Sequence, residues 1–399
     1  MDPNPREDTI ARLQSNWTWV PDWIDASNAG EAARLVTFRR QVVIDKTPPE
    51  CLVRLSADTR YKLSVNSERV CVGPSRGSDK LWFYDTVDLA SHLKVGKNVI
   101  IIQVLRFFNN VVAGIPFARN AMPGLTILGQ INGQDISTGR QDTEWEGRVE
   151  DGVYYPTGSK WDIFLHTYER VQSSAARQWQ KLQRYRLIGH FGILSPWRLR
   201  PRMIPLAETT VAPFKAVRDA QSEHSAQEWT EFFHGQPLTL APGTKHRVEV
   251  EYTTHSTAFV RLSASRAHSL GSKVSFTYSE AYQPQPNGRK GDRTKREGQG
   301  LSGPSDTYEF SGNGNGEVES YEPFWWKTFR FLVVEIEVGP DPLELLAFEA
   351  TQTNYPMDVT AVWNGGSDEM DKMWEVSVRT MRNCMFDGYS DCPFYEQLQ

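Results

Sequence analysis

Three carboxylates on a loop-like segment near the C-terminus are the residues best suited to chemistry. Asp387, Asp391 and Glu396 lie in the run DGYSDCPFYEQ, which glycine and proline mark as a loop. Glycoside hydrolysis requires a carboxylic acid that keeps its proton until it donates it to the leaving oxygen. Apolar neighbours such as Phe394 and Tyr395 raise the pKa of a carboxyl group. The run therefore suits a sugar site, although a structural loop with solvated acids accounts for the same residues equally well.

Two other motifs lack the context that their chemistry needs. The GxGxxG run at 298–303 follows a charged loop instead of a strand, and Pro304 stands where a nucleotide-binding helix would begin. The GxSxG run at 73–77 leads into strand-like residues 81–84, whereas a nucleophile elbow leads into a helix. We interpret the first run as a surface loop and the second as a turn between strands, so Ser75 is not a candidate nucleophile.

The spacing of histidine and cysteine indicates neither a metal site nor a disulfide framework. The eight histidines show no HxxH or HxxxH pattern, and the four cysteines include no CxxC pair. We therefore expect no metal, no other cofactor and four reduced thiols.

Composition and charge exclude several classes of partner. The 399 residues include 44 Lys and Arg against 49 Asp and Glu, a net charge of -5. Such a balance gives no general attraction to nucleic acid or to an anionic membrane surface. Apolar runs stop far short of the roughly 20 residues that a membrane helix needs. The N-terminus carries charges and prolines where a secretory signal is apolar, so we expect a cytoplasmic protein.

Period-two patterning predicts antiparallel β-structure in the first half of the chain. Tyr61, Leu63 and Val65 share one face of a strand, and a turn follows at 66–69. Residues 98–105 are apolar enough for a central strand. Residues 172–202 are compatible with either a helical stripe or irregular strands, and prolines after them indicate an extended connector.

A second β region follows the connector. Val248, Val250 and Tyr252 alternate with Glu249 and Glu251, which predicts one buried and one solvated side. The next strand, 258–262, follows the same pattern except that an apolar residue, at position 259, stands on its polar side. Strands at 329–336 and 343–348 complete a second sandwich.

The pattern changes to helical spacing near the C-terminus. Met370, Met373, Trp374, Val378 and Met381 recur at three- and four-residue intervals. Acidic residues follow a serine at position 367 that can cap the helix. We predict a helix of about 15 residues that ends near position 383 and needs partners to cover its apolar stripe.

The C-terminal run resembles the active-site segment of the inverting α-L-rhamnosidases, whose catalytic domain is an (α/α)6 barrel preceded by β-sandwich domains. The similarity extends to the first β region at 61–66, 73–74 and 82–85, and to the second at 303–308 and 321–330. By this resemblance Glu396 is the general acid, and Asp391 binds sugar hydroxyls near the reacting carbon. Many members carry an arginine where Tyr395 stands and a second acid where Gln397 stands.

The resemblance implies a fold and a domain organisation. We expect a mostly β chain with two antiparallel, jelly-roll-like β-sandwich domains followed by the start of an (α/α)6 barrel. The domains are predicted at 1–205, including the connector, at 206–356, and at 357–399 for the first part of the catalytic domain.

The resemblance also implies a substrate, a rhamnose-containing glycoside or oligosaccharide. In the family the general base comes from much later in the barrel, so the prediction is that this chain alone is inactive. The alternatives are a carbohydrate-binding β-sandwich module without chemistry and a β-sandwich scaffold that only supports the barrel.

Overall fold

The chain divides into two compact units. The first comprises Met1–Asn110, Ile115–Asp151 and Ala176–Ala207, and the second comprises Val111–Gly114, Gly152–Ala175 and Glu208–Gln399. The computed structural model describes residues 7–25, 31–78, 80–108, 118–139, 144–156, 167–173, 178–184, 196–284, 292–312, 317–394 and 396–397.

The first unit is a sandwich of two six-stranded sheets. One sheet has the order β15-β1-β8-β3-β6-β16 and the other the order β14-β11-β2-β7-β4-β5, with a small β9-β10 hairpin beside them. Its elements are α1 (Glu7–Ser15), β1 (Thr18–Trp19), β2 (Ala33–Ile44), β3 (Leu52–Asp58), β4 (Arg60–Val65), β5 (Glu68–Gly73), β6 (Trp82–Asp88), the 3-10 turn η2 (Ala90–His92), β7 (Gly96–Phe107), β8 (Gly124–Leu128), β9 (Gln130–Ile131), β10 (Gln134–Asp135), β11 (Glu146–Val149), β14 (Gln180–Lys181), β15 (Gln183–Arg184) and β16 (Leu199–Pro201).

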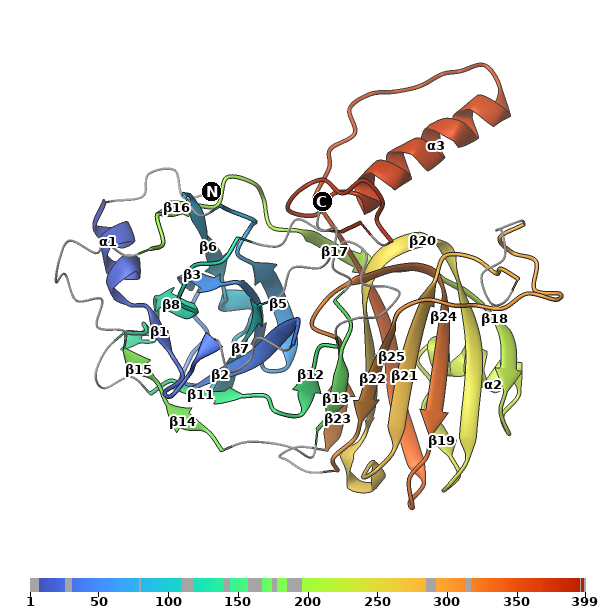
Figure 1. Ribbon diagram of the computed structural model, residues 1–399, viewed down its shortest axis with the longest axis horizontal. Coiled ribbons are helices and arrows are strands. Elements are labelled where there is room, and N and C mark those ends of the chain that lie inside the picture. Colours follow the sequence, from blue (N-terminus) through green and yellow to red (C-terminus); the bar gives the residue numbers. More distant parts are fainter. Residues whose placement is uncertain are drawn as a thin grey trace. The chain divides into compact units, whose positions relative to one another are not determined.

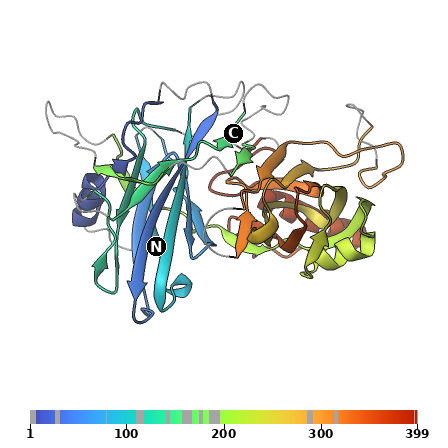
Figure 2. The same cartoon turned by 90° about the horizontal axis from the view of Figure 1, so that it is seen from below.

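The core of this unit lies between the two sheets. Strands β2 and β7 pair antiparallel along their full lengths and run side by side in Figure 2. Tyr61, Leu63 and Val65 of β4 are buried in the core, which confirms the predicted inward face. The predicted turn is also present, because Asn66 and Ser67 adopt φ of 52° and 72° between β4 and β5.

The region that the sequence left open contains short strands and no helix among its described residues. Within 178–184 and 196–202 it forms the short strands β14, β15 and β16. Strand β16 pairs parallel with β6, so the proline-rich connector closes the edge of a sheet. Tyr185 and Leu187, which contributed to the possible helical stripe, lie outside the described residues.

The second unit is built on one large sheet. Its order is β12-β13-β22-β21-β24-β20-β25-β17, with β18 and β23 also paired to β20 and β19 to β25. Its elements are β12 (Val153–Tyr154), β13 (Arg170–Gln172), β17 (Glu208–Val211), β18 (Phe214–Gln221), α2 (Ala226–Phe233), β19 (Leu238–Leu240), β20 (Lys245–Ser265), the 3-10 turn η4 (Arg266–His268), β21 (Lys273–Ser279), β22 (Ser305–Glu309), β23 (Val318–Tyr321), β24 (Lys327–Glu337), β25 (Leu343–Asn354) and α3 (Asp368–Asn383).

The long strand β20 shapes this unit. Its first half pairs with β18 and β24, and its second half pairs with β25 and β23. The register with β24 shifts between Glu251 and Ser256, where an irregularity of this kind bends a strand. The apolar residues of both halves enter one core, together with β21, β24 and β25 (Figure 1). The predominantly antiparallel β fold confirms the predicted class.

One part of the second β region differs from prediction. Glu249 and Glu251 were expected on a solvated side, but both are buried. Lys215 and Arg330 place nitrogens 2.9 and 2.8 Å from Oε1 of Glu251, and the Tyr282 hydroxyl donates to Glu249 over 2.7 Å. The two glutamates do share the face opposite the apolar residues, but neighbouring cations and a tyrosine cover that face of β20.

Residues 152–175 belong to the second unit, although the predicted first domain ran without interruption over 1–205. Strand β13 pairs parallel with β22. The backbone amide of Glu169 donates to the carboxylate of Asp306 over 2.7 Å. The carboxylate of Glu169 accepts hydrogen bonds from the Tyr155 hydroxyl over 2.9 Å and from the Phe324 backbone over 3.1 Å. Asp306 in turn forms a buried ion pair of 3.0 Å with Lys327. Strands β13 and β22 lie more than a hundred residues apart in the sequence, so local patterns do not indicate that they pair.

Helix α3 agrees with its prediction. It covers Asp368–Asn383, and the hydroxyl of Ser367 accepts a hydrogen bond from the Met370 backbone. Met370, Met373 and Met381 are exposed along it. None of the described helices is both long and apolar enough to cross a membrane.

Candidate functional site

The two predicted site residues lie together in the segment that follows α3. Asp391 is exposed and Glu396 is partly buried. Burial raises the pKa of Glu396 above its ordinary value, and a hydrogen bond with Asp391 and the charge of that carboxylate raise it further. Two carboxyl groups in hydrogen-bond contact retain a proton more readily than either would alone. The pair can therefore hold a proton for donation.

Gln397 fixes the backbone next to Glu396. Its side chain is buried, and its Oε1 accepts a hydrogen bond of 2.9 Å from the indole of Trp325. Its Nε2 donates to the carbonyl of Pro393 over 2.9 Å, and the hydroxyl of Thr328 donates to the same carbonyl over 2.6 Å. These contacts hold both ends of the 393–397 turn against the second sandwich.

A stack of aromatic rings attaches the same segment to β20. Trp326 stacks on Phe386 and on Trp325, with ring centroids 3.9 and 4.2 Å apart. Phe259 of β20 meets the edge of Trp326 at 6.4 Å. Phe259, the apolar residue on the polar side of this strand, is thus part of the surface against which the site segment, residues 384–397, packs. The apolar residue at position 259 was the signal in the sequence for this contact, but the sequence did not show which residues would cover Phe259.

The end of α3 is held by hydrogen bonds from the sheet. The amide of Asn383 donates to the His255 carbonyl over 2.7 Å, and Thr257 donates to the Asn383 carbonyl over 3.3 Å. Asn354 donates to the Arg382 carbonyl over 2.8 Å. Figure 1 shows the helix extending away from this anchored end. The site segment therefore starts from a fixed point.

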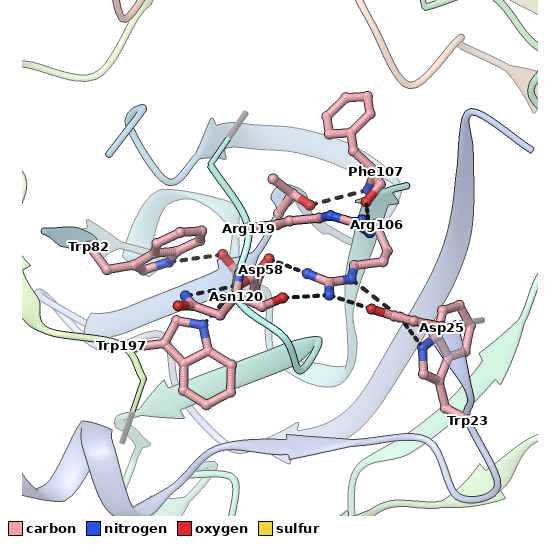
Figure 3. Close-up of polar contacts among 11 residues, drawn as sticks. Trp23, Asp25, Asp58, Trp82, Arg106, Phe107, Arg119, Asn120 and Trp197 are labelled. Atoms are coloured by element: carbon pink, nitrogen blue, oxygen red, sulfur yellow. Dashed lines mark hydrogen bonds and ion pairs between the residues drawn. The ribbon is translucent and has the colours of Figure 1, made fainter. Parts of the chain in front are cut away.

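A second polar cluster lies in the first unit and is drawn in Figure 3. Arg106 forms ion pairs of 2.5 Å with both Asp58 and Asp25. The other oxygen of Asp58 accepts hydrogen bonds from Trp197 over 2.9 Å and from the backbone and side chain of Asn120 over 2.9 and 3.2 Å. Asp58 and Arg106 are fully buried. Both oxygens of Asp58 are engaged, so this cluster stabilises the end of the sandwich and offers no group to a ligand.

A groove of about 690 Å³ lies in the second unit, and none of the residues that line it belongs to the segment that carries Glu396. Its lining includes Arg170, Gln172, Lys245, Lys273 and Glu309. Lys245 and Lys273 pair with glutamates over 2.6 and 3.5 Å. Apolar side chains such as Val171 and Val274 line the groove together with charged and amide groups on neighbouring strands, which can form hydrogen bonds.

The remaining motifs lie where the sequence placed them. Ser75 is buried in the connection between β5 and β6, with no helix after it. The GxGxxG run lies between β21 and β22, where Gln283 bridges to Gly300. Among the described residues no three His, Cys, Asp or Glu side chains are arranged to hold a metal ion. His166 and His190 fall outside those residues, as does Tyr395.

Comparison with known proteins gives matches only among solved structures, because no protein-family model and no curated protein matches the sequence. A GH78-family rhamnosidase of Bacillus sp. GL1 matches 96% of this chain with a TM-score of 0.68 and 14% identity. The α-L-rhamnosidase of Dictyoglumus thermophilum matches 98% with a TM-score of 0.58 and 16% identity. The Streptomyces avermitilis α-L-rhamnosidase complexed with L-rhamnose matches 94% with a TM-score of 0.53 and 15% identity.

The chain has the fold of the α-L-rhamnosidases. The resemblance inferred from the C-terminal run and the sandwich motifs is thereby confirmed at the level of the fold. The chain spans 59%, 41% and 35% of the three matched chains. Within the α-L-rhamnosidase fold of this chain, the acidic pair Asp391 and Glu396 is attached to the second sandwich by Gln397 and the aromatic stack.

Proposed function

We propose that the chain is the N-terminal portion of an α-L-rhamnosidase-like glycoside hydrolase, which removes terminal α-L-rhamnose with inversion. The observation that carries this proposal is the α-L-rhamnosidase fold of a chain in which the segment bearing Asp391 and Glu396 is fixed to the second sandwich. Its substrate is a rhamnose-containing glycoside or oligosaccharide.

Glu396 serves as the general acid in this proposal. The acid must be protonated before it donates to the glycosidic oxygen, and the raised pKa of Glu396 favours that state. Asp391 is exposed beside it and binds hydroxyl groups of the sugar near the reacting carbon. Its charge also helps Glu396 to keep its proton.

Asp391 is unsuited to the role of the base. An inverting reaction places the base about 6.5 to 9.5 Å from the acid so that a water molecule fits between them. Asp391 instead acts on Glu396 as a neighbour, because a hydrogen bond and its charge help to raise the pKa of Glu396. The base is therefore proposed to come from a later part of the helical domain that begins at 357–399, and the 399-residue chain alone is proposed not to turn over.

The test is to incubate the purified chain with an aryl α-L-rhamnoside and to measure release of the phenol. We expect no release above that of a buffer blank. Sustained hydrolysis that Glu396→Gln abolishes would contradict the proposed inactivity while supporting the role of Glu396. Calorimetric titration with L-rhamnose tests binding separately, and Asp391→Asn is expected to abolish it, whereas Asp358→Asn, an exposed acid outside the segment, is expected to leave it unchanged.

The groove in the second unit supports a second candidate function, carbohydrate binding by the second sandwich without chemistry. Hydroxyl groups of a sugar can replace water on charged and amide side chains such as Arg170, Gln172 and Lys273. Titration with rhamnosylated oligosaccharides distinguishes the two candidates. Binding weakened by Arg170→Ala and unaffected by Asp391→Asn favours the groove, and the opposite pattern favours the acidic pair.

A further inference from the structure

Two cysteines stand at the two ends of the loop that carries Asp391. Cys384 follows the last residue of α3, and Cys392 follows Asp391 directly. Both side chains are partly exposed. The loop between them, 385–391, is the connection from the anchored helix end to the turn that holds Glu396.

Backbone contacts bring the ends of this loop together. The carbonyl of Cys384 accepts a hydrogen bond of 2.9 Å from the Ser390 backbone and one of 3.3 Å from its hydroxyl. Met385 and Tyr389 form an antiparallel bridge inside the loop. The loop is thus a closed hairpin with the two cysteines at its neck.

The thiol of Cys384 points at the peptide bond that leads into Cys392. Its Sγ lies 3.8 Å from the carbonyl oxygen of Asp391, and that carbonyl carbon is bonded to the nitrogen of Cys392. The oxygen that the thiol contacts therefore belongs to the residue directly before Cys392, which carries the second sulfur. A disulfide needs Cβ atoms about 3.8 Å apart, a separation that the backbone at the neck sets and that closure of the neck provides, after which rotation about each Cα–Cβ bond brings the two sulfurs together.

We propose that Cys384 and Cys392 are a redox-sensitive pair that forms a disulfide across the neck of this loop when the protein meets a low-molecular-weight disulfide such as oxidised glutathione. One protein thiolate attacks the oxidant, forms a mixed disulfide and releases one glutathione thiolate. The second protein thiolate then attacks the protein sulfur of that mixed disulfide and releases the other glutathione. Two protein S–H bonds are lost, and the two electrons reduce the oxidant to two thiols.

The other two cysteines provide an internal contrast. Cys51 and Cys71 are buried, whereas Cys384 and Cys392 are partly exposed. Burial raises the pKa of Cys51 to about 11 and of Cys71 to about 12, and it also raises the pKa of Cys384, so the contrast rests on access to the oxidant. Buried, protonated thiols react slowly with disulfides. We therefore expect oxidation of the folded chain to be confined to the pair at the loop neck.

The disulfide affects the acidic pair through the loop. A covalent bond at the neck restricts the 385–391 hairpin and thereby the position of Asp391 relative to Glu396. This consequence, unlike the disulfide itself, rests on the proposed function. Oxidation is expected to change the affinity for L-rhamnose of a chain that binds it through Asp391.

The experiment exposes the folded chain to oxidised glutathione, then denatures it, alkylates the remaining thiols and digests it with trypsin. No lysine or arginine follows Arg382, so both cysteines fall in the peptide 383–399. This peptide is expected to lack both alkyl groups and to weigh two hydrogen atoms less than its reduced form. The free thiols of the denatured chain are expected to fall from four to two.

Matched variants complete the test. Cys384→Ser and Cys392→Ser are each expected to abolish the internal loss of two hydrogens, whereas Cys71→Ser is expected to retain it. Four remaining thiols, a stable glutathione adduct on the wild-type peptide, or a disulfide between two chains would each overturn the proposal. The mass measurement needs no sugar, so its result is independent of whether rhamnose binds.

Discussion

Glu396 and Gln397 are adjacent in the chain but have opposite surroundings. Glu396 is partly exposed beside Asp391, while Gln397 is buried and bonded to Trp325 and Pro393. Many α-L-rhamnosidases carry an acid at position 397. A carboxylate there offers only acceptors, so it could not donate to the Pro393 carbonyl as the Gln397 amide does. The amide fits this turn because it donates and accepts at once.

Asp391 should add to the effect of burial, which is the largest cause of the raised pKa of Glu396. Replacing Asp391 by asparagine removes a negative charge and leaves an amide that donates a hydrogen bond to ionised Glu396. We expect the pKa of Glu396 to fall toward or below its ordinary value. Titration of carbon-13-labelled glutamate side chains by NMR measures it. A pKa that stays raised in Asp391→Asn would show that burial alone sets it.

Removing the Gln397 side chain should loosen the site segment. Gln397→Ala leaves the Trp325 indole without its acceptor, and an unpaired buried donor costs about 1–3 kcal/mol. We expect faster hydrogen exchange in residues 384–397 with little change elsewhere. Gln236→Ala, at an exposed position after α2, is the control. Equal exchange in both variants would mean that the aromatic stack alone holds the segment.

At the scale of elements, the sequence correctly predicted the features of helix α3 that depend on residues close together in the chain. Helix α3 begins at its serine cap and ends at position 383 as predicted, because capping and periodicity are encoded within a few residues. The capping box of α2, Ser225 with Glu228, was present in the sequence as well but was overlooked. The pairing of β13 with β22 and the burial of Glu251 depend on distant partners, so no local pattern indicated them.

The two capped helices should respond differently to loss of their caps. Helix α2 buries Trp229, Phe232 and Phe233 in the core, whereas α3 exposes much of its apolar stripe. We expect Ser225→Ala to lower the free energy of unfolding of the second unit by about 1 kcal/mol. Ser367→Ala should reduce helicity in α3 without moving that transition. Urea unfolding and circular dichroism measure both, and equal shifts would contradict the distinction.

Glu319 of β23 should make the second unit sensitive to acid. Burial alone would raise its pKa, but hydrogen bonds from Ser311, Tyr308 and Ser269 outweigh burial and lower the pKa below 4.5. A carboxylate with a lowered pKa stabilises the fold above its unfolded pKa, and this contribution is lost as pH falls through the folded pKa. Urea unfolding at several pH values should therefore show that Glu319→Gln is destabilising at pH 7 and progressively less so as the pH falls below the ordinary range of a glutamate. A difference that does not change with pH would contradict this account.

At the scale of the whole molecule, the sequence predicted two β-sandwich domains at 1–205 and 206–356, and the pairing of β13 with β22 adds residues 152–175 to the second unit. Each unit has its own apolar core and its own buried ion pair, Arg106 with Asp58 in the first and Lys327 with Asp306 in the second. Asp306 and Lys327 lie within the motifs that resemble α-L-rhamnosidases, at 303–308 and 321–330, whereas Asp58 and Arg106 lie outside the motifs of the first β region. The same residues that carry the resemblance thus stabilise the sheet that supports Glu396.

Separate cores and separate ion pairs predict two unfolding transitions. Removing one partner of a buried ion pair costs about 3–5 kcal/mol because the other charge stays buried and unpaired. Arg106→Leu should therefore destabilise the first unit, and Lys327→Met the second. Lys245→Leu is the control, because its ion pair with Glu337 is exposed and contributes at most about 1 kcal/mol.

Hydrogen exchange at increasing urea concentration assigns each transition to its peptides. Peptides from 152–175 should unfold with β22 and not with the flanking segments of the first unit, because β13 pairs with β22. They should respond to Lys327→Met and not to Arg106→Leu. If both variants shift all peptides together, the two units form one cooperative structure, and the stability of the acidic site then depends on the first sandwich as much as on the second.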